Sequence, residues 1–330
     1  MHDVRSGRGR VIKALGVAVL ASLPGGLALS VASTAQAATL EQLQATWRET
    51  IRTTATPGEG CFTADYPRIA WTKVACSTKV APPFIPKNGG GGFTVGNGND
   101  YAAVVTSLIS DGVGSFPVVT GVTKETGYGG APNTYSLQLN SQFFKTTVCN
   151  GGANPSQCLG WQQFVYSSSE DIAFMQYWLI NYGSRCPSGG WMSYQGSCYK
   201  NSREVSVPLQ VISQLANLAV TGKAVSGGSD TITLTTASHA YSATGADSVT
   251  LLAHYWKGSE FNIVGDGGGS AANFNKGSHI TVNIALTDGS TTAPVCKAHD
   301  GTTGETNNLN LGSCTTAGGS TPSVKFTESN

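Results

Sequence analysis

The chain has 330 residues, of which 12% are charged, 40% are hydrophobic and 42 are glycine. The low share of charge excludes a disordered chain whose solubility rests on charge, and the glycine content excludes a bundle of helices rich in Glu, Lys and Leu. A formal net charge of +1 offers no basic stripe that could neutralise phosphates, so we expect no nucleic-acid partner. The composition instead favours β-structure with many tight turns.

The first 37 residues have the pattern of a secretory signal peptide. A basic start that includes Arg5 and Lys13 precedes an apolar run at 14–33, which ends at the small-residue cleavage pattern Ala35-Gln36-Ala37. A membrane anchor is the alternative, but Pro24-Gly25-Gly26 interrupts the run. We therefore expect a secreted, extracellular protein that has no membrane attachment after cleavage.

The eight cysteines fall into four pairs that are local in sequence. In an oxidising compartment an even number of cysteines favours disulfides over thiolate chemistry. The short Cys-x-x-Cys or Cys/His clusters of a zinc site are missing from the sequence, so we expect no metal. The expected disulfides are Cys61–Cys76, Cys149–Cys158, Cys186–Cys198 and Cys296–Cys314.

The N-terminal part of the mature chain has helical spacing. Apolar residues from Leu40 to Ile51 recur with the period of a helix and predict one at 39–53, with Thr39 as its cap. A second helix is predicted at 100–110. The Pro- and Gly-rich residues between them, from Pro82 to Gly92, predict a linker or surface arm. We expect residues 38–130 to be a pro-segment or an accessory lobe.

From about residue 131 the pattern changes to alternation, which predicts strands separated by Gly, Asn and Asp clusters. The segment 211–220 fits either a strand or a short helix. Many short strands without alternating helices favour an all-β fold, an antiparallel β-sandwich of the concanavalin-like jelly-roll type at 131–330. The strands are expected at residues 134–140, 161–167, 172–180, 191–199, 203–207, 231–235, 248–255, 260–264 and 279–286.

Two of these strands carry candidate chemistry. Alternation places Phe174, Gln176 and Trp178 on one face of the first, so Gln176 is either a hydrogen-bonded core residue or the polar centre of an aromatic-lined groove. On the second, Glu260 and Asn262 share a polar face that Asp266 could join. A carboxylate and an amide that meet in one groove can activate water and hold a developing oxyanion.

The order of these features resembles the eqolisin family of glutamic peptidases, secreted acid endopeptidases with a β-sandwich fold. In that family a Gln and a Glu form the catalytic dyad, and Gln176 matches the Gln. The position of the family's Glu is Val264 in this chain, so the resemblance leaves Glu260 or, through a bulge, Asp266 for the role, or else the dyad is lost. The matching segments are Gly160-Trp161, Ala173-Phe174-Met175-Gln176, Gly190-Trp191-Met192-Ser193-Tyr194, Glu260-Phe261-Asn262-Ile263-Val264 and Asn273-Phe274.

Two functions remain open at this point. The first is a monomeric acid endopeptidase that needs no cofactor and acts on a protein or peptide, with Gln176 and Asp266 or Glu260 as catalytic residues. The second is a non-catalytic protein on the same sandwich that binds a glycan or a peptide by aromatic stacking. The expected substrate-binding residues are Trp161, Phe174, Tyr177, Trp178 and Asn262.

Overall fold

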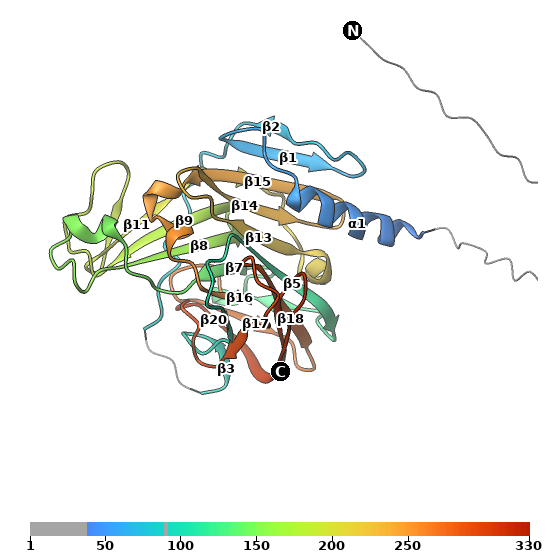
Figure 1. Cartoon of the computed structure of the whole chain (residues 1–330). Coiled ribbons are helices and arrows are strands. Elements are labelled where there is room, and N and C mark those ends of the chain that lie inside the picture. The colour runs from blue at the N-terminus through green and yellow to red at the C-terminus, as the bar shows by residue number, and fades with distance from the viewer. Residues whose placement is uncertain (1–37, 89–91) are drawn as a thin grey trace, which may run out of the picture. The chain divides into compact units, whose positions relative to one another are not determined.

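The computed structural model describes residues 38–88 and 92–330, and residues 39–330 form one compact unit. The expected signal peptide lies outside the described residues. The helix predicted at 39–53 is confirmed as α1 (Leu40–Thr53). Thr39 and Gln42 each bond the other's backbone N–H, which closes a capping box at its N-terminus. Trp47 and Ile51 form its buried face. The helix itself lies beside β14 and β15 (Figure 1).

The strands form two large sheets, and all pairings are antiparallel except that of β17 with β20. The all-β sandwich with a small N-terminal helix is thus confirmed. The twelve-stranded sheet has the order β2 (Thr72–Val74), β1 (Cys61–Asp65), β15 (His239–Ala246), β14 (Ser229–Thr235), β13 (Ala219–Lys223), β5 (Asp111–Thr120), β18 (His279–Thr287), β21 (Ser323–Ser329), β20 (Thr306–Ala317), β17 (Ala271–Phe274) and β6 (Glu125–Thr126), with β3 (Thr94–Gly96) paired to β20. The nine-stranded sheet has the order β10 (Met192–Tyr194), β11 (Ser197–Asn201), β9 (Ile172–Ile180), β8 (Leu159–Ser167), β7 (Ser136–Ser141), β16 (Gly258–Val264), β4 (Ala102–Val104) and β19 (Val295–Lys297), with β12 (Val205–Ser206) paired to β9. Short 3₁₀ helices lie at η1 (Tyr128–Gly130), η2 (Thr147–Gly151), η3 (Ile212–Asn217), η4 (Asp247–Val249) and η5 (Leu252–His254).

Aromatic rings fill the core between the sheets by packing against glycines of the facing strands. The rings of Phe116 and Phe261 have centroids 5.0 Å apart. A Cβ on Gly114 would lie 2.0 Å from the ring of Phe261, and one on Gly222 would lie 2.5 Å from the ring of Phe164. These two glycines therefore allow the sheets to approach closely enough to bury the rings.

Local pattern gave wrong predictions in three places. The single strand predicted at 191–199 is a hairpin, because the chain turns after Tyr194 and β10 pairs with β11. The helix predicted at 100–110 is wrong: β4 pairs there with β16 and β19, so tertiary pairing outweighs the helical spacing. The strand predicted at 248–255 is also wrong, because the backbone turns through η4 and η5, where Asp247 accepts a hydrogen bond from the N–H of Ala253. The ambiguous segment 211–220 contains η3 and the start of β13.

The separate lobe expected at 38–130 is corrected by the sheet order. Strand β5 lies inside the twelve-stranded sheet, hydrogen-bonded to both β13 and β18, so residue 130 is not a structural boundary. The surface arm expected from Pro82 to Gly92 is wrong for its first residues, because Phe84 and Ile85 are buried. The described residues before 89 contribute α1, the edge strand β2, and β1, which lies between β2 and β15.

All four expected disulfides are confirmed: Cys61–Cys76, Cys149–Cys158, Cys186–Cys198 and Cys296–Cys314. Each closes a loop of the size that stabilises a fold by about 3 kcal/mol on the chain-entropy model. Within the described residues, no helix combines the length and the apolar character that crossing a membrane requires.

Candidate functional site

A row of polar side chains crosses four neighbouring strands of the nine-stranded sheet. The register places Gln176 of β9 opposite Gln163 of β8, Gln163 opposite Asn140 of β7, and Asn140 opposite Glu260 of β16. Directly opposite residues share a face, so the four side chains form one polar row, and all are buried. Gln176 and Glu260 therefore lie in the same row but about 14 Å apart, since three strand spacings separate them.

The chain's own residues 80–88, which we call the strap, cover the Gln176 end of this row. Phe84 N donates to Gln176 Oε1 at 2.7 Å, and Gln176 Nε2 donates to Pro82 O at 3.0 Å. The Gln176 amide also donates to Asn201 Oδ1 at 2.9 Å and accepts from Trp178 Nε1 at 3.0 Å. Gln176 is thus fully buried beneath the strap, where it binds both an N–H and a carbonyl of this extended segment; we call the surface that the strap covers the groove.

The carboxyl of Glu305 binds the N–H of the next residue of the strap, Ile85. Glu305 Oε1 accepts from Ile85 N and from Gly269 N, both at 3.0 Å. Glu305 Oε2 accepts from Thr303 Oγ1 at 2.6 Å and from Gln138 Nε2 at 3.2 Å. Burial raises the pKa of Glu305, while these donors act in the opposite direction. Nothing in the sequence singles out Glu305, because it precedes β20 in a segment without a recognisable motif.

Glu260 lies in a buried cluster of three carboxyls, with Asp100 and Glu328. Its Oε2 accepts from the N–H and the hydroxyl of Thr302, at 2.7 and 2.8 Å. Asn262 donates to Asp100 Oδ1 at 2.7 Å and to Glu328 Oε2 at 3.3 Å. One oxygen of each carboxyl has no hydrogen-bond partner. Asn262 therefore bridges Asp100 and Glu328, and neither Asn262 nor Glu260 bonds to the strap.

Asp266 lies at the end of the β8–β9 hairpin. Its Oδ2 accepts from Ser169 N at 2.7 Å, and burial raises its pKa. Gln176 lies four residues along β9 from Ile172, the first residue after this turn, which is about 13 Å of extended chain. The structure therefore brings neither Asp266 nor Glu260 into hydrogen-bond contact with Gln176.

The aromatic candidates divide between the two faces of β9. Phe174 faces the groove, where its ring lies 5.9 Å from that of Phe84. Trp161 and Trp178 are on the same face but have no exposed surface, which removes them as open stacking platforms. Tyr177 lies on the other face of β9, where alternation turns it into the core between the sheets and away from the strap. A hollow of about 300 Å³ beside Trp178 is lined by Phe143, Tyr194 and residues 85–88 of the strap.

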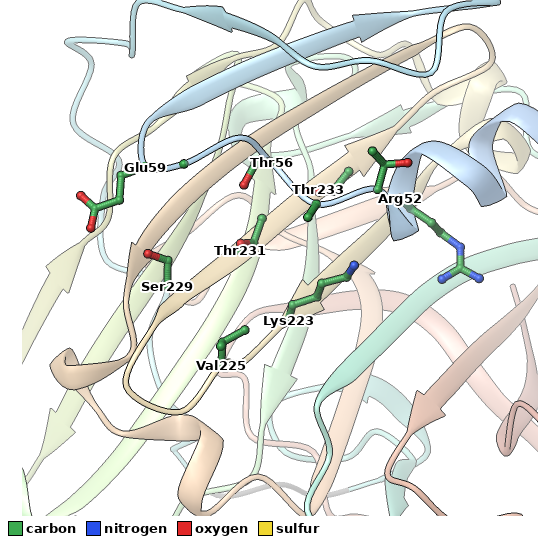
Figure 2. A pocket seen from close by; sticks show the side chains of 11 residues that line it. Arg52, Thr56, Glu59, Lys223, Val225, Ser229, Thr231 and Thr233 are labelled. Carbon is green, nitrogen blue, oxygen red and sulfur yellow. The ribbon is translucent and has the colours of Figure 1, made fainter. Parts of the chain in front are cut away.

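Another hollow, of about 280 Å³, lies away from the groove (Figure 2). It separates the chain after α1 from β13 and β14, and Thr231 and Thr233 line it on the face opposite to core residues Ile232 and Leu234. Lys223 at its wall pairs with Asp111 at 3.7 Å. It contains no buried amide–carboxyl pair, so the groove is the better candidate. Over residues 38–88 and 92–330, no cluster of three or more His, Cys, Asp or Glu could hold a metal ion.

Comparison with known proteins adds little to this description of the site. No family model and no curated protein matches the chain. A crystal structure of scytalido-glutamic peptidase with a peptide-based transition state analog is similar over 71% of this chain and 98% of that chain, with 11% sequence identity and a TM-score of 0.27. A TM-score this low carries no argument, so we assign the site from the contacts of this chain alone.

Proposed function

We propose that the protein is a secreted peptidase that cleaves extended peptides in the groove over β8 and β9. One observation carries the proposal: Gln176 and Glu305 bind the backbone N–H groups of two consecutive residues, Phe84 and Ile85. An amide and a buried carboxyl are thereby aligned along one peptide, the arrangement that an acid–base peptidase needs. The resemblance of the Gln176 segment to eqolisins agrees with this function.

In this proposal Glu305 acts on the bond that corresponds to Phe84–Ile85. As a carboxylate it takes a proton from water while the water oxygen bonds to the carbonyl carbon, whose π electrons move to the carbonyl oxygen. Glu305 then passes the proton to the nitrogen, the C=O bond re-forms as the C–N bond breaks, and a carboxylic acid and an amine leave. Glu305 Oε1 lies 3.0 Å from the Ile85 nitrogen, within reach of this second transfer.

Gln176 positions the peptide. Its Oε1 and Nε2 bind the backbone on both sides of residue 83, which fixes the strand direction of a peptide in the groove. The required carboxylate form of Glu305 sets the acid limb of activity. Because burial raises the pKa of Glu305, this limb lies at higher pH than an exposed glutamate would give.

A peptide-binding protein without hydrolysis is the second candidate. It is favoured by Gln176, whose amide is saturated by the strap, Asn201 and Trp178, as a pure recognition group would be. The burial of Trp161 and Trp178 makes a glycan the weaker choice of ligand, because a sugar ring needs an exposed aromatic face.

The test uses the full chain with Phe84→Asp, which places a charge in an apolar site and expels the strap from the groove. We expect this variant to cleave a denatured protein between pH 2 and pH 8. Adding Glu305→Gln should lower turnover by roughly 10²–10⁴-fold, the usual range for an acid–base group. Adding Gln176→Ala should cost roughly 100-fold through misplacement of the peptide.

Two exposed positions supply controls. Glu59→Gln and Gln214→Ala make the same chemical changes outside the groove and should leave turnover unchanged. Cleavage that survives both groove substitutions would refute the assigned residues. Peptide binding by Phe84→Asp without cleavage at any pH would instead establish the second candidate.

A further inference from the structure

We propose that the strap is a built-in copy of the substrate, so that the groove selects peptides with an aromatic residue followed by an aliphatic one. This inference rests on the proposed function, because it treats the bound peptide as a substrate. The selection of side chains itself concerns only peptide binding. The expected ligand is an extended peptide that takes the place of residues 80–88 in the groove.

The main chain of the strap is bound almost residue by residue. Besides the bonds to Gln176 and Glu305, Asn201 Nδ2 donates to Ala81 O at 3.2 Å, Gly268 N donates to Pro83 O at 2.9 Å, and Gly304 N donates to Ile85 O at 2.8 Å. Prolines stand at 82, 83 and 86 and offer no N–H. Backbone recognition of this kind suits any extended peptide, so selection must come from the side chains.

The Phe84 side chain fills an apolar site on the groove floor. It is fully buried against Val165, Ile172 and Phe174, which share one face of β8 and β9. Burying a ring of this size favours binding by roughly 10- to 100-fold over a small residue. A charged side chain would lose its hydration there without gaining a partner. This position of the groove therefore selects an aromatic or a large apolar residue.

The Ile85 side chain lies in a narrower slot built from glycines. A Cβ on Gly304 would lie 2.7 Å from Ile85 Cγ1, and one on Gly269 would lie 2.9 Å from Ile85 Cδ1. Gly269 also has a φ of +73°, a left-handed conformation that favours glycine. The backbone of two loops thus forms two close walls that fit an aliphatic side chain, and on these two sides there is no room for a larger ring.

The attachment of the strap allows a free peptide to compete with it. The disulfide Cys61–Cys76 closes within residues 39–88, so no covalent cross-link ties the strap to the groove. Outside the strap, residues 39–79 are held by α1 and by the pairing of β1 with β15. Just before the strap, Ser77 N donates to Glu204 O, and Lys79 contacts Glu170 O and Asp171. Weakening the strap should therefore open the groove while the sandwich stays folded.

The experiment measures binding of a fluorescent peptide with the sequence of residues 80–88, Val-Ala-Pro-Pro-Phe-Ile-Pro-Lys-Asn, to the full chain by anisotropy. We expect binding to Phe84→Asp to be at least 10-fold tighter than to wild type, whose groove is filled. In the peptide, Phe to Asp and Ile to Trp should each weaken binding at least 10-fold. Replacing the peptide's Lys by Ala should change it less than 3-fold. Phe84→Ala repeats the measurement if Phe84→Asp fails to fold.

The outcomes separate this inference from the proposed function. Selective binding without hydrolysis supports the inference and refutes the peptidase. Hydrolysis with equal binding of all the peptides supports the peptidase and overturns the inference. Gly304→Ala narrows the slot for Ile85. In the Phe84→Asp background it should weaken binding of the unchanged peptide at least 10-fold. Unchanged binding by this variant, with its unfolding transition intact, would also overturn the inference.

Discussion

Glu328 should make the protein more stable in acid than at neutral pH. It is completely buried on β21, with one oxygen bonded to Asn262 and the other without a partner. Burial raises its pKa from 4.5 to about 8. A carboxyl whose pKa is higher in the folded state binds more protons there, so its stabilising effect is complete below pH 4.5 and is lost as the pH rises through about 8.

The size of the effect follows from the shift. Each pKa unit corresponds to about 1.4 kcal/mol, so Glu328 alone would lower the free energy of unfolding by about 5 kcal/mol between pH 4 and pH 9. Asp100, in the same cluster, acts in the same direction, because burial and then the charge of Glu260 raise its pKa. Glu328→Gln mimics the protonated carboxyl and should remove most of the Glu328 contribution.

The assay is urea unfolding followed by tryptophan fluorescence from pH 4 to pH 9, with the disulfides intact. At pH 4 we expect Glu328→Gln and wild type to agree within about 1 kcal/mol. At pH 8 the variant should be more stable by about 4 kcal/mol. Glu59→Gln, which removes an exposed carboxyl, should follow the wild-type curve. Parallel curves for Glu328→Gln and wild type would refute the assignment of a neutral, buried Glu328.

Three further predictions test the fold and the export of the chain. Gly114→Ala should lower the free energy of unfolding by about 3 kcal/mol because its Cβ would overlap the Phe261 ring, whereas Gly258→Ala, whose Cβ meets nothing closer than 3.4 Å, should cost less than half as much in the same urea titration. Replacing both Cys296 and Cys314 by Ser should cost about 3 kcal/mol, measured by calorimetry, and an unchanged melting temperature would contradict the loop-closure argument. N-terminal sequencing of the exported protein should begin at Ala38; an intact Met1 in the culture medium would contradict the signal peptide.

Elements with a strong local period could be predicted from sequence. The strand at 172–180 agrees with β9 residue for residue, because alternation there coincides with burial between two neighbouring strands. The helix at 39–53 was signalled by both its apolar spacing and its Thr39 cap. The strand β5 was missed, since its glycines at 112 and 114 suggest turns. The structure shows why these glycines stand in a strand: they leave room for aromatic rings of the facing sheet.

Only one of the two key groups of the candidate site could be predicted from the sequence. Gln176 stands in a recognisable strand, whereas Glu305 is important only through its contacts with Gln138 and with the strap, which are distant in sequence. No periodicity in a single chain segment reports such contacts.

The burial of the strap could not be predicted from the sequence either. Its prolines predicted an exposed linker, since proline interrupts helices and strands. Yet a proline has one fewer backbone donor to satisfy, so a segment with Pro82, Pro83 and Pro86 can be buried at the cost of few hydrogen bonds. The remaining N–H groups at 84 and 85 then need strong acceptors, and the groove supplies the two that define the site, Gln176 and Glu305. Pro- and Phe-rich segments before a sandwich of this kind should therefore be examined as groove ligands before they are treated as linkers.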